Sequence, residues 1–407
     1  MISVKKTLTV LFVFICLCSG AQHVRTDYPF IHKAFNKITY SGDSSAFTRV
    51  FKKLDDIAAG SNKQLRIVHI GGSHVQAGLW SGNFVNAFHE KYITAGGGYF
   101  VFPYRIGKTN GQPFATSFTD GKWKLCRSIG KSFCMPLGMS ALSVSTRDSA
   151  NLFGVRLTKS AACKFVNEVK VFHNFSAGYR FELCARDSLR VKRSENREAG
   201  FTRFVFDLPA DSFCFRLLRI DTLNPDFSLF GFSLENTIAP GFYLAALGAN
   251  GASSTSFLRS ENLVQQLAAI EPDLYILSLG VNDTQSKGFE KDDFIENYDT
   301  LITILRKASP NSAVLLTTTT DNYIRRRTSN RRSITAKEAM FQLMLTHDIG
   351  VWDLFSLMGG YRSMTNWHKA GLASRDKVHF NSRGYGVVSA LMFEAFIKAY
   401  EFNRVKQ

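Results

Sequence analysis

A serine near the start of the sequence and an Asp-x-x-His segment near its end carry the residue types of a catalytic triad. Ser73 lies in the run Gly71-Gly72-Ser73-His74, directly after the apolar segment 65–70. A serine hydroxyl becomes a useful nucleophile when a neighbouring base takes its proton. His379 could be that base, with Asp376 fixing the orientation of its ring. These residues predict acyl-enzyme chemistry at an ester carbonyl.

Two further segments could supply donors for the oxyanion that forms during such a reaction. Gly251, in Gly248-Ala249-Asn250-Gly251-Ala252, could offer its backbone N–H, and Asn282 could offer its carboxamide at the end of an apolar run. The backbone N–H of Ser73 would be a third donor. Taken singly, each segment is also typical of an ordinary turn or of a solvated helix start, with Asp376 as its cap. All four together, in this order, favour a catalytic site.

These segments resemble signature blocks I, II, III and V of the SGNH (GDSL-like) hydrolases, whose defining residues fall on Ser73, Gly251, Asn282 and His379. Within the superfamily, the chain most resembles bacterial peptidoglycan O-acetylesterases and related carbohydrate esterases. They share a Gly-x-Ser-His block and a segment similar to 367–385, and they carry an inserted β-sandwich. The resemblance implies a flavodoxin-like three-layer α/β/α hydrolase domain. It also implies a serine esterase that removes O-acyl groups, O-acetyl above all, from a polysaccharide such as peptidoglycan.

One position departs from the family's pattern. The first block of these hydrolases usually reads Gly-Asp-Ser, whereas this sequence has Gly72 in place of the aspartate. That aspartate is not the acid of the triad, so the nucleophile can survive its loss. Glycine is the most flexible residue, and we expect the loop that carries Ser73 to be less firmly held.

The elements around these residues alternate between strands and helices. A strand at 65–70 is followed by a helix through 84–89, and the alternation resumes with strands at 274–279, 313–318 and 351–355 and helices at 256–270, 293–308, 337–346 and 384–402. Such alternation predicts a parallel sheet covered by helices on both faces. In such sheets ligands bind at the carboxyl ends of the strands, where Ser73 and Asn282 are expected.

The stretch between the two α/β parts has a different texture. Short runs without helical period, such as 152–157, 166–172, 180–184, 201–208 and 212–218, are separated by turn-rich segments. They predict an all-β sandwich, resembling a jelly roll. We therefore expect a signal peptide at 1–21, hydrolase parts at 22–108 and 240–407, and an inserted sandwich, a candidate carbohydrate-binding module, at 109–239.

The first residues have the form of a secretory signal. Lys5 and Lys6 precede an apolar run and small residues before Gln22, and the run is shorter than the ~20 residues that span a bilayer. We expect a secreted or periplasmic protein without a membrane span. Cleavage would lower the net charge from +17 to +15. That surplus favours anionic partners such as cell-envelope glycans, and no nucleic-acid motif accompanies it.

Five cysteines would remain in the mature chain, which leaves at least one without an intramolecular partner: Cys126, Cys134, Cys163, Cys184 and Cys214. Their pairing does not follow from the sequence. There is no Cys-x-x-Cys or His-Glu-x-x-His motif, so neither a metal nor another cofactor is expected.

Three residues are candidates for substrate binding. His74 could support the nucleophile, Trp367 could be a core residue or an apolar wall for a sugar, and Arg325 lies in an arginine-rich loop that could be merely solvated or could contact an anionic glycan. Two other functions stay open. An O-acyltransferase would use the same acyl-enzyme, and a decayed hydrolase could remain as a glycan-binding envelope protein.

Overall fold

The computed structural model describes residues 24–42, 45–129, 134–184, 190–223 and 226–406. The predicted signal peptide at 1–21 lies outside these ranges. None of the helices formed by the described residues is long and apolar enough to cross a membrane.

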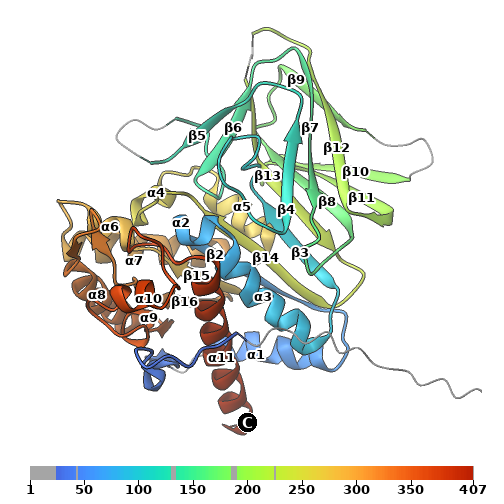
Figure 1. Ribbon diagram of the computed structural model, residues 1–407. Helices are drawn as coiled ribbons and strands as arrows, with labels where there is room; N and C mark the ends of the chain where they lie inside the picture. Colours follow the sequence, from blue (N-terminus) through green and yellow to red (C-terminus); the bar gives the residue numbers. More distant parts are fainter. Residues whose placement is uncertain (1–23, 43–44, 130–133, 185–189, 224–225, 407) are drawn as a thin grey trace, which may run out of the picture.

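A parallel sheet lies at the centre of the α/β part (Figure 1). Its strands follow the order β14 (Gly241–Gly248), β2 (Gln64–Gly71), β15 (Leu274–Ser278), β16 (Ala313–Thr317) and β19 (Gly350–Trp352). Counted along the chain from β2, this is the 2-1-3-4-5 order of flavodoxin-like sheets. The strands are almost entirely buried, because both faces of the sheet are covered. The short strand β1 (Ile38–Tyr40) pairs antiparallel with β19.

Helices form two layers against this sheet. One layer contains α1 (Ser45–Ala58), α3 (Leu79–Tyr92) and α11 (Ser382–Lys406), and the other contains α5 (Leu263–Ile270), α7 (Lys291–Ala308) and α8 (Arg332–Thr346). In α1 the buried residues recur every three or four positions, which places them on one face of the helix: Phe47, Val50, Phe51, Leu54 and Ile57. The predicted three-layer α/β/α architecture is confirmed.

Two segments predicted as single helices are each divided. The helix after Ser73 is broken at Gly78, whose φ of 69° is left-handed, into α2 (Ser73–Gln76) and α3. The predicted helix 256–270 is α4 (Ser254–Leu258) followed by α5, with Ser253 forming a capping box at the start of α4. Each break leaves a short helix after a strand of the central sheet: α2 follows β2, and α4 follows β14.

From β4 to β13 the described residues form strands and no helix, as predicted for the insert. The strands make two packed layers, β4–β7–β12–β9 and β5–β6–β13–β8–β11–β10. Phenylalanines fill the space between them; for example, the ring centroids of Phe204 and Phe215 lie 5.4 Å apart. The strand bounds are β4 Ala115–Thr119, β5 Lys124–Arg127, β6 Leu142–Thr146, β7 Ala150–Leu157, β8 Val166–His173, β9 Tyr179–Leu183, β10 Val191–Asn196, β11 Phe201–Ala210, β12 Ser212–Arg219 and β13 Phe227–Asn236.

The sandwich and the hydrolase sheet are continuous through β3 (Gly96–Val101). This strand pairs parallel with β14 on one side and antiparallel with β13 on the other. Its glycines are required, because a Cβ at Gly97 would lie 2.0 Å from the carbonyl oxygen of Phe242, and one at Gly98 would lie 1.9 Å from that of Leu234. The insert is therefore fused to the catalytic sheet and not joined to it by a flexible linker.

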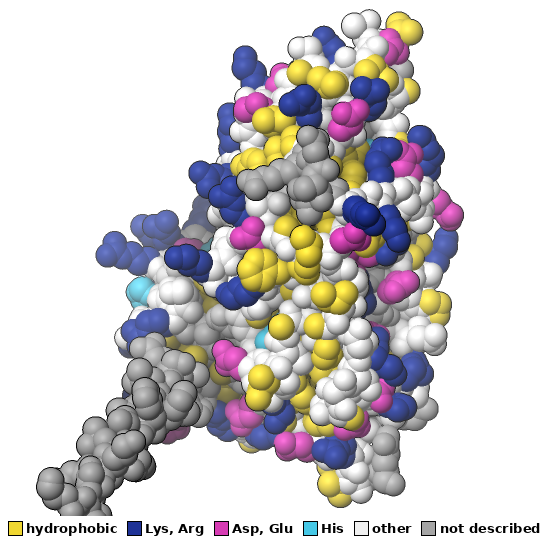
Figure 2. All heavy atoms as spheres, turned by 90° about the vertical axis from the view of Figure 1, so that its right-hand side faces the viewer, with side chains coloured by type: hydrophobic (Ala, Val, Ile, Leu, Met, Phe, Trp, Pro, Cys, Tyr) yellow, Lys and Arg dark blue, Asp and Glu magenta, His cyan; other side chains and the backbone are white. Residues whose placement is uncertain are grey.

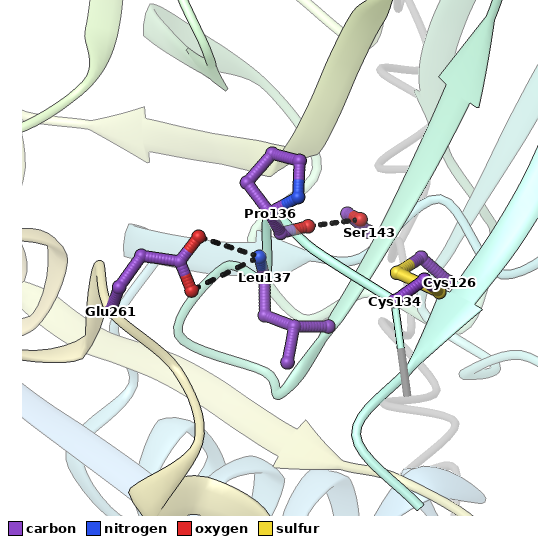
Figure 3. The surroundings of a disulfide bond; sticks show 6 residues. All are labelled: Cys126, Cys134, Pro136, Leu137, Ser143 and Glu261. Atoms are coloured by element: carbon purple, nitrogen blue, oxygen red, sulfur yellow. Dashed lines mark hydrogen bonds between the residues drawn. A yellow bond between two sulfur atoms is a disulfide. The ribbon is translucent and has the colours of Figure 1, made fainter. Parts of the chain in front are cut away.

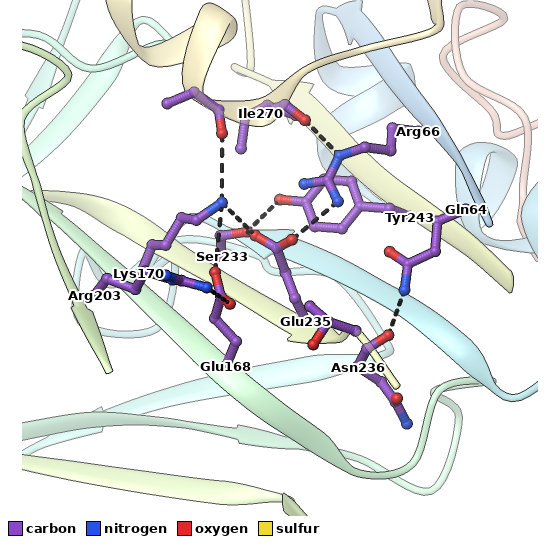
Figure 4. A network of polar contacts seen from close by, with 12 residues as sticks. Gln64, Arg66, Glu168, Lys170, Arg203, Ser233, Glu235, Asn236, Tyr243 and Ile270 are labelled. Atoms are coloured by element: carbon purple, nitrogen blue, oxygen red, sulfur yellow. Dashed lines mark hydrogen bonds and ion pairs between the residues drawn. The ribbon is translucent and has the colours of Figure 1, made fainter. Parts of the chain in front are cut away.

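Buried charges hold this junction together (Figure 4). The Glu235 carboxylate of β13 accepts a hydrogen bond from the Arg66 guanidinium of β2 at 2.9 Å and forms an ion pair with Lys170 of β8 at 3.0 Å. Burial alone would raise the pKa of Glu235, but the two cations outweigh it and lower the pKa to about 2. The carboxylate thus stays charged and fixes β13 against the hydrolase sheet.

Cys126 and Cys134 form a disulfide at the base of the segment between β5 and β6 (Figure 3). The chain beyond it rests on the α/β part, where the Leu137 N–H donates to the Glu261 carboxylate at 3.3 Å. Three cysteines of the described chain remain free thiols: Cys163, Cys184 and Cys214.

Candidate active site

The three predicted catalytic side chains form an unbroken chain of hydrogen bonds. Ser73 Oγ lies 2.7 Å from His379 Nε2, and His379 Nδ1 lies 2.8 Å from Asp376 Oδ2. The other carboxylate oxygen, Asp376 Oδ1, accepts the backbone N–H groups of Val378 and His379 at 2.9 and 3.0 Å. The carboxylate is therefore fixed by its own loop and directed at the imidazole.

The position of Ser73 follows from the strand order. Ser73 follows β2 and Asn282 follows β15, and these are the strands between which flavodoxin-like sheets reverse their order. A crevice forms there because the two crossover connections leave in opposite directions. Two largely buried strands thus place two polar side chains at one edge of the sheet.

A tight turn between Leu372 and Phe380 presents the histidine. Ala373 and Phe380 form a β-bridge, the Ser374 N–H donates to the His379 carbonyl at 2.8 Å, and Lys377 takes a left-handed φ of 55°. Phe380 is buried beneath the turn. The imidazole therefore rests on a folded support.

The local charges keep Asp376 ionised. Partial burial would raise the pKa of Asp376, but the hydrogen bonds from the His379 ring and from two backbone N–H groups outweigh it and lower this pKa. An ionised aspartate can hold the imidazole in one tautomer and stabilise the imidazolium that forms after proton transfer.

His74 lies beside the triad but cannot serve as its base. Burial, and then the nearby His379, lower the pKa of His74 to about 3, so its ring is neutral at ordinary pH. Its Nδ1 is 3.0 Å from the Tyr385 hydroxyl, and its ring centroid is 5.2 Å from that of His379. The side chain is buried, so it supports His379 and does not face a substrate.

Two of the three expected oxyanion donors, Gly251 and Asn282, line one cavity, and Gly72, the residue before Ser73, lies next to the Asn282 carboxamide. Within the described part of the chain, the backbone N–H groups of Ser73 and Gly251 donate to no protein acceptor. Asn282 Nδ2 donates one hydrogen to the Ala252 carbonyl at 2.8 Å, which fixes the carboxamide and leaves its second hydrogen available. The arrangement suits an anionic oxygen held by two amides and a carboxamide.

Two residues that the sequence did not reveal hold these donors in place. Gln76 Oε1 accepts the Asn250 N–H at 2.6 Å and so anchors the loop that carries Gly251. The Asp283 carboxylate accepts both the backbone N–H and the hydroxyl of Ser254, at 3.0 and 2.6 Å. Gln76 stands shortly after Ser73 in the sequence and Asp283 directly after Asn282, but only the tertiary contacts reveal their roles.

Gly72 lies against the oxyanion side of the site. Its φ is −88°, so the backbone does not demand glycine here. A Cβ at this position would lie 3.1 Å from Asn282 Nδ2 and 3.3 Å from the Ala252 carbonyl oxygen. The Asn282 carboxamide thus lies close to the space that a side chain at position 72 would need.

The remaining substrate-binding candidates have different surroundings. Trp367 is fully buried, with its indole N–H donating to the Met358 carbonyl at 2.9 Å and its ring 4.9 Å from that of Phe380. It is a core residue, so the alternative of a sugar-contacting wall is wrong. Arg325 is exposed at the tip of a hairpin.

A cavity of about 360 Å³ adjoins the oxyanion donors, with Gly251 and Asn282 in its wall. Ile129, from the segment after β5 of the sandwich, lines the same cavity, and the Arg127 guanidinium donates to the Asn250 carbonyl at 2.5 Å. The insert therefore contributes to the surroundings of the site. Among the described residues, no cluster of three or more His, Cys, Asp or Glu side chains could hold a metal ion.

Part of the chain matches the model of a known enzyme family. Residues 228–387 match the GDSL-like lipase/acylhydrolase family, a range that contains Gly251, Asn282, Asp376 and His379 but not Ser73. Together with the fold, this match supports the predicted ester-bond hydrolase of the GDSL-like acylhydrolase type. The predicted class is confirmed. Comparison with curated protein sequences gives no significant match.

Solved structures resemble the chain to different extents. A peptidoglycan O-acetylesterase superposes with a TM-score of 0.73 at 19% identity, covering 89% of this chain and 99% of that protein. A lipase/acylhydrolase from Enterococcus faecalis (TM-score 0.31, 21% identity) covers 38% of this chain and 75% of its own. A carbohydrate esterase family 3 protein from Talaromyces cellulolyticus (TM-score 0.31, 17% identity) covers 42% and 76%. The first of these shares the two-part architecture and not only the hydrolase domain.

Proposed function

We propose that this chain is a secreted or periplasmic serine esterase that removes O-acyl groups, O-acetyl above all, from a polysaccharide such as peptidoglycan. The observation that carries the proposal is the hydrogen-bonded chain from Ser73 Oγ through His379 to Asp376. In a catalytically decayed hydrolase we would expect this hydrogen-bonded alignment and the oriented oxyanion donors to be lost, whereas here they are present together.

In the proposed mechanism, Ser73 Oγ attacks the ester carbonyl carbon while His379 Nε2 takes the hydroxyl proton. The negative charge that develops on the carbonyl oxygen is stabilised by the N–H groups of Ser73 and Gly251 and by the Asn282 carboxamide. The tetrahedral intermediate then expels the sugar oxygen, which His379 protonates. Water, deprotonated by His379, hydrolyses the acyl-enzyme and releases the carboxylic acid and free Ser73.

Four features support a polysaccharide of the cell envelope as the substrate. The structure that shares the two-part architecture is named a peptidoglycan O-acetylesterase. The sequence begins with the pattern of a secretory signal, and the net charge of +17 favours anionic surroundings. The site is open at the sheet edge, where a polymer could approach.

The proposal is tested by measuring acetate release from O-acetylated peptidoglycan, acetylated xylan and a small chromogenic acetate side by side. We expect release from all three, fastest from peptidoglycan, and loss of all three activities in Ser73→Ala. Ser160→Ala, at an exposed turn of the sandwich, is the matched control and should keep full activity. Release in buffer without a sugar acceptor separates hydrolysis from acyl transfer. Unchanged turnover in Ser73→Ala would remove Ser73 from the mechanism.

A further inference from the structure

Basic side chains gather around one side of the triad. We call them the basic rim, and all are exposed except the half-buried Lys377: Arg325, Arg326, Arg327, Arg331, Arg362, Arg375 and Lys377. They come from the hairpin of β17 (Tyr323–Ile324) and β18 (Thr328–Ser329), from the start of α8, from the loop before α10 (Met364–Lys369), and from the turn that carries Asp376 and His379.

The hairpin is attached directly to the catalytic turn. The Tyr323 N–H donates to the Lys377 carbonyl at 3.1 Å, and the Lys377 ammonium lies 4.8 Å from the centroid of the Tyr323 ring. Lys377 is two residues from His379. Arg325 is two residues beyond Tyr323, which is about 7 Å further along an extended strand. The rim therefore begins at the triad and extends away from it.

The rim also contains an accessible aromatic ring. The partly exposed Tyr361 lies between two guanidinium groups, that of Arg331 at 5.6 Å and that of Arg362 at 5.3 Å from its centroid. An aromatic face flanked by guanidinium groups can contact a sugar ring and its carboxylate at the same time.

The backbone of the rim is unusual. Of the nine non-glycine residues with positive φ in the described chain, four belong to it: Arg325 (48°), Arg326 (66°), Arg362 (69°) and Lys377 (55°). The Arg327 N–H bonds to the Ile324 carbonyl at 3.2 Å, so Arg325 and Arg326 are the central residues of a hairpin turn. With both φ angles positive, as in a type I′ turn, Asn-Gly would be the favoured pair. Arg325 and Arg326 thus occupy turn positions whose backbone conformation favours other residues.

The rim cations have no carboxylate partner among the described residues. Within the described residues, none of them forms an ion pair with a carboxylate, whereas Arg147, Arg180, Arg193 and Arg203 of the sandwich each do. On the face shown in Figure 2, basic side chains are likewise interspersed with acidic ones. The Asp321 carboxylate next to the hairpin is buried, and it accepts hydrogen bonds from the Met364 N–H and the Ser329 hydroxyl.

We propose that the basic rim binds carboxylates of the acylated polymer, so that the enzyme selects glycans carrying free carboxylates close to the ester. This rests on the proposed function, because it takes an acylated glycan as the substrate. Guanidinium groups suit the task since they bind carboxylates in a bidentate manner. The hairpin's arginines are specificity-determining residues, and they take no part in the chemical step.

The test uses one polymer in two forms: O-acetylated peptidoglycan, and the same preparation with its carboxylates amidated by carbodiimide coupling. For the wild type we expect kcat/KM for acetate release to be on the order of 10-fold higher on the free-carboxylate form, and the ratio to fall as salt is added. In the triple variant Arg325→Gln/Arg326→Gln/Arg327→Gln this ratio should approach 1, because KM for the free-carboxylate form rises. Each rate is normalised to the same variant's rate on the chromogenic acetate.

Lys159→Gln/Lys192→Gln/Lys307→Gln removes the same charge from exposed positions outside the rim and should keep the ratio. Equal rates of the wild type on both polymers, or an equal loss in this control, would overturn the proposal. Binding of the Ser73→Ala variant to the two immobilised polymers tests the rim without turnover. A lack of activity on the chromogenic acetate would thus reject the proposed esterase function. Equal binding to both polymers would instead reject carboxylate binding by the basic rim.

A second variant separates recognition from folding. Arg325→Asn/Arg326→Gly installs the favoured turn pair, so its melting temperature should be equal to or higher than that of the wild type, while the preference for the carboxylate form is lost. A lower melting temperature with the preference retained would show that these arginines serve the hairpin and not the substrate.

Discussion

Placing an aspartate at position 72, where related hydrolases carry one, should impair this enzyme. A Cβ at Gly72 would already lie 3.1 Å from Asn282 Nδ2 and 3.3 Å from the Ala252 carbonyl oxygen, closer than ordinary van der Waals contact. Asn282 would have to move by a few tenths of an ångström. Since Asn282 is held by its bond to Ala252, this movement would disturb the proposed oxyanion donor itself.

The expected loss in kcat can be estimated from these contacts. Complete removal of one oxyanion donor typically costs about 100- to 1000-fold in kcat. Gly72→Ala, which adds only the Cβ, should cost a fraction of this, less than about 10-fold. Gly72→Asp would also add a negative charge near the developing oxyanion. At ~5 Å and an effective dielectric constant of ~20, two such charges repel by about 3 kcal/mol, which is roughly another 100-fold.

The assay compares kcat on the chromogenic acetate and the melting temperature for Gly72→Ala, Gly72→Asn and Gly72→Asp. Asparagine matches the size of aspartate without its charge, so the difference between these two variants isolates the electrostatic part. A rise in kcat for Gly72→Asp with unchanged or higher stability would refute the reasoning. It would show instead that the glycine leaves the nucleophile loop under-supported.

Other perturbations should have equally specific results. Ser73→Ala should abolish ester hydrolysis with an unchanged melting temperature, checked by calorimetry. Asn282→Ala should lower kcat on the order of 100-fold in steady-state assays. Glu235→Gln leaves two buried cations without their shared anion and should lower the free energy of unfolding by about 3–5 kcal/mol in urea titrations. Because the folded pKa of Glu235 is lowered to about 2, its contribution is fully present above its unfolded pKa of about 4.3 and is lost as the pH falls toward 2. Cys126→Ser/Cys134→Ser opens a short loop and should cost about 2–3 kcal/mol by the same measurement.

The sequence revealed those parts of the fold that local pattern determines. Apolar runs such as 274–279 and 313–318 indicated buried parallel strands, and the polar residues after them indicated the edge of the sheet where Asn282 lies. The triad could be predicted because Ser73 and His379 stand in short motifs whose chemistry is local. Gln76 could not, since its role depends on the Asn250 loop, which lies far along the chain.

The junction of the two parts was beyond the sequence for a physical reason. β3 begins with three glycines, which have low strand propensity, and it becomes a strand only because β14 and β13 approach it closely from both sides. The break between α4 and α5 is likewise caused by contacts with a distant part of the chain. The apolar period continues across it, while the Ser260 hydroxyl and Asn262 carboxamide bond to carbonyls of the insert.

The continuous sheet limits how the proposed polymer substrate could be recognised. Because β3 joins the sandwich to the hydrolase by backbone hydrogen bonds, the two parts cannot close on a substrate by rotating about a linker. Selectivity must come from the loops at the sheet edge. The Gly251 loop follows β14, and Ile129 of the insert lies beside it. The arginine hairpin follows β16, which is three strand spacings, or about 14 Å, from β14. Ser73 lies between them after β2, so a glycan that crosses the nucleophile can contact the insert and the basic rim at once.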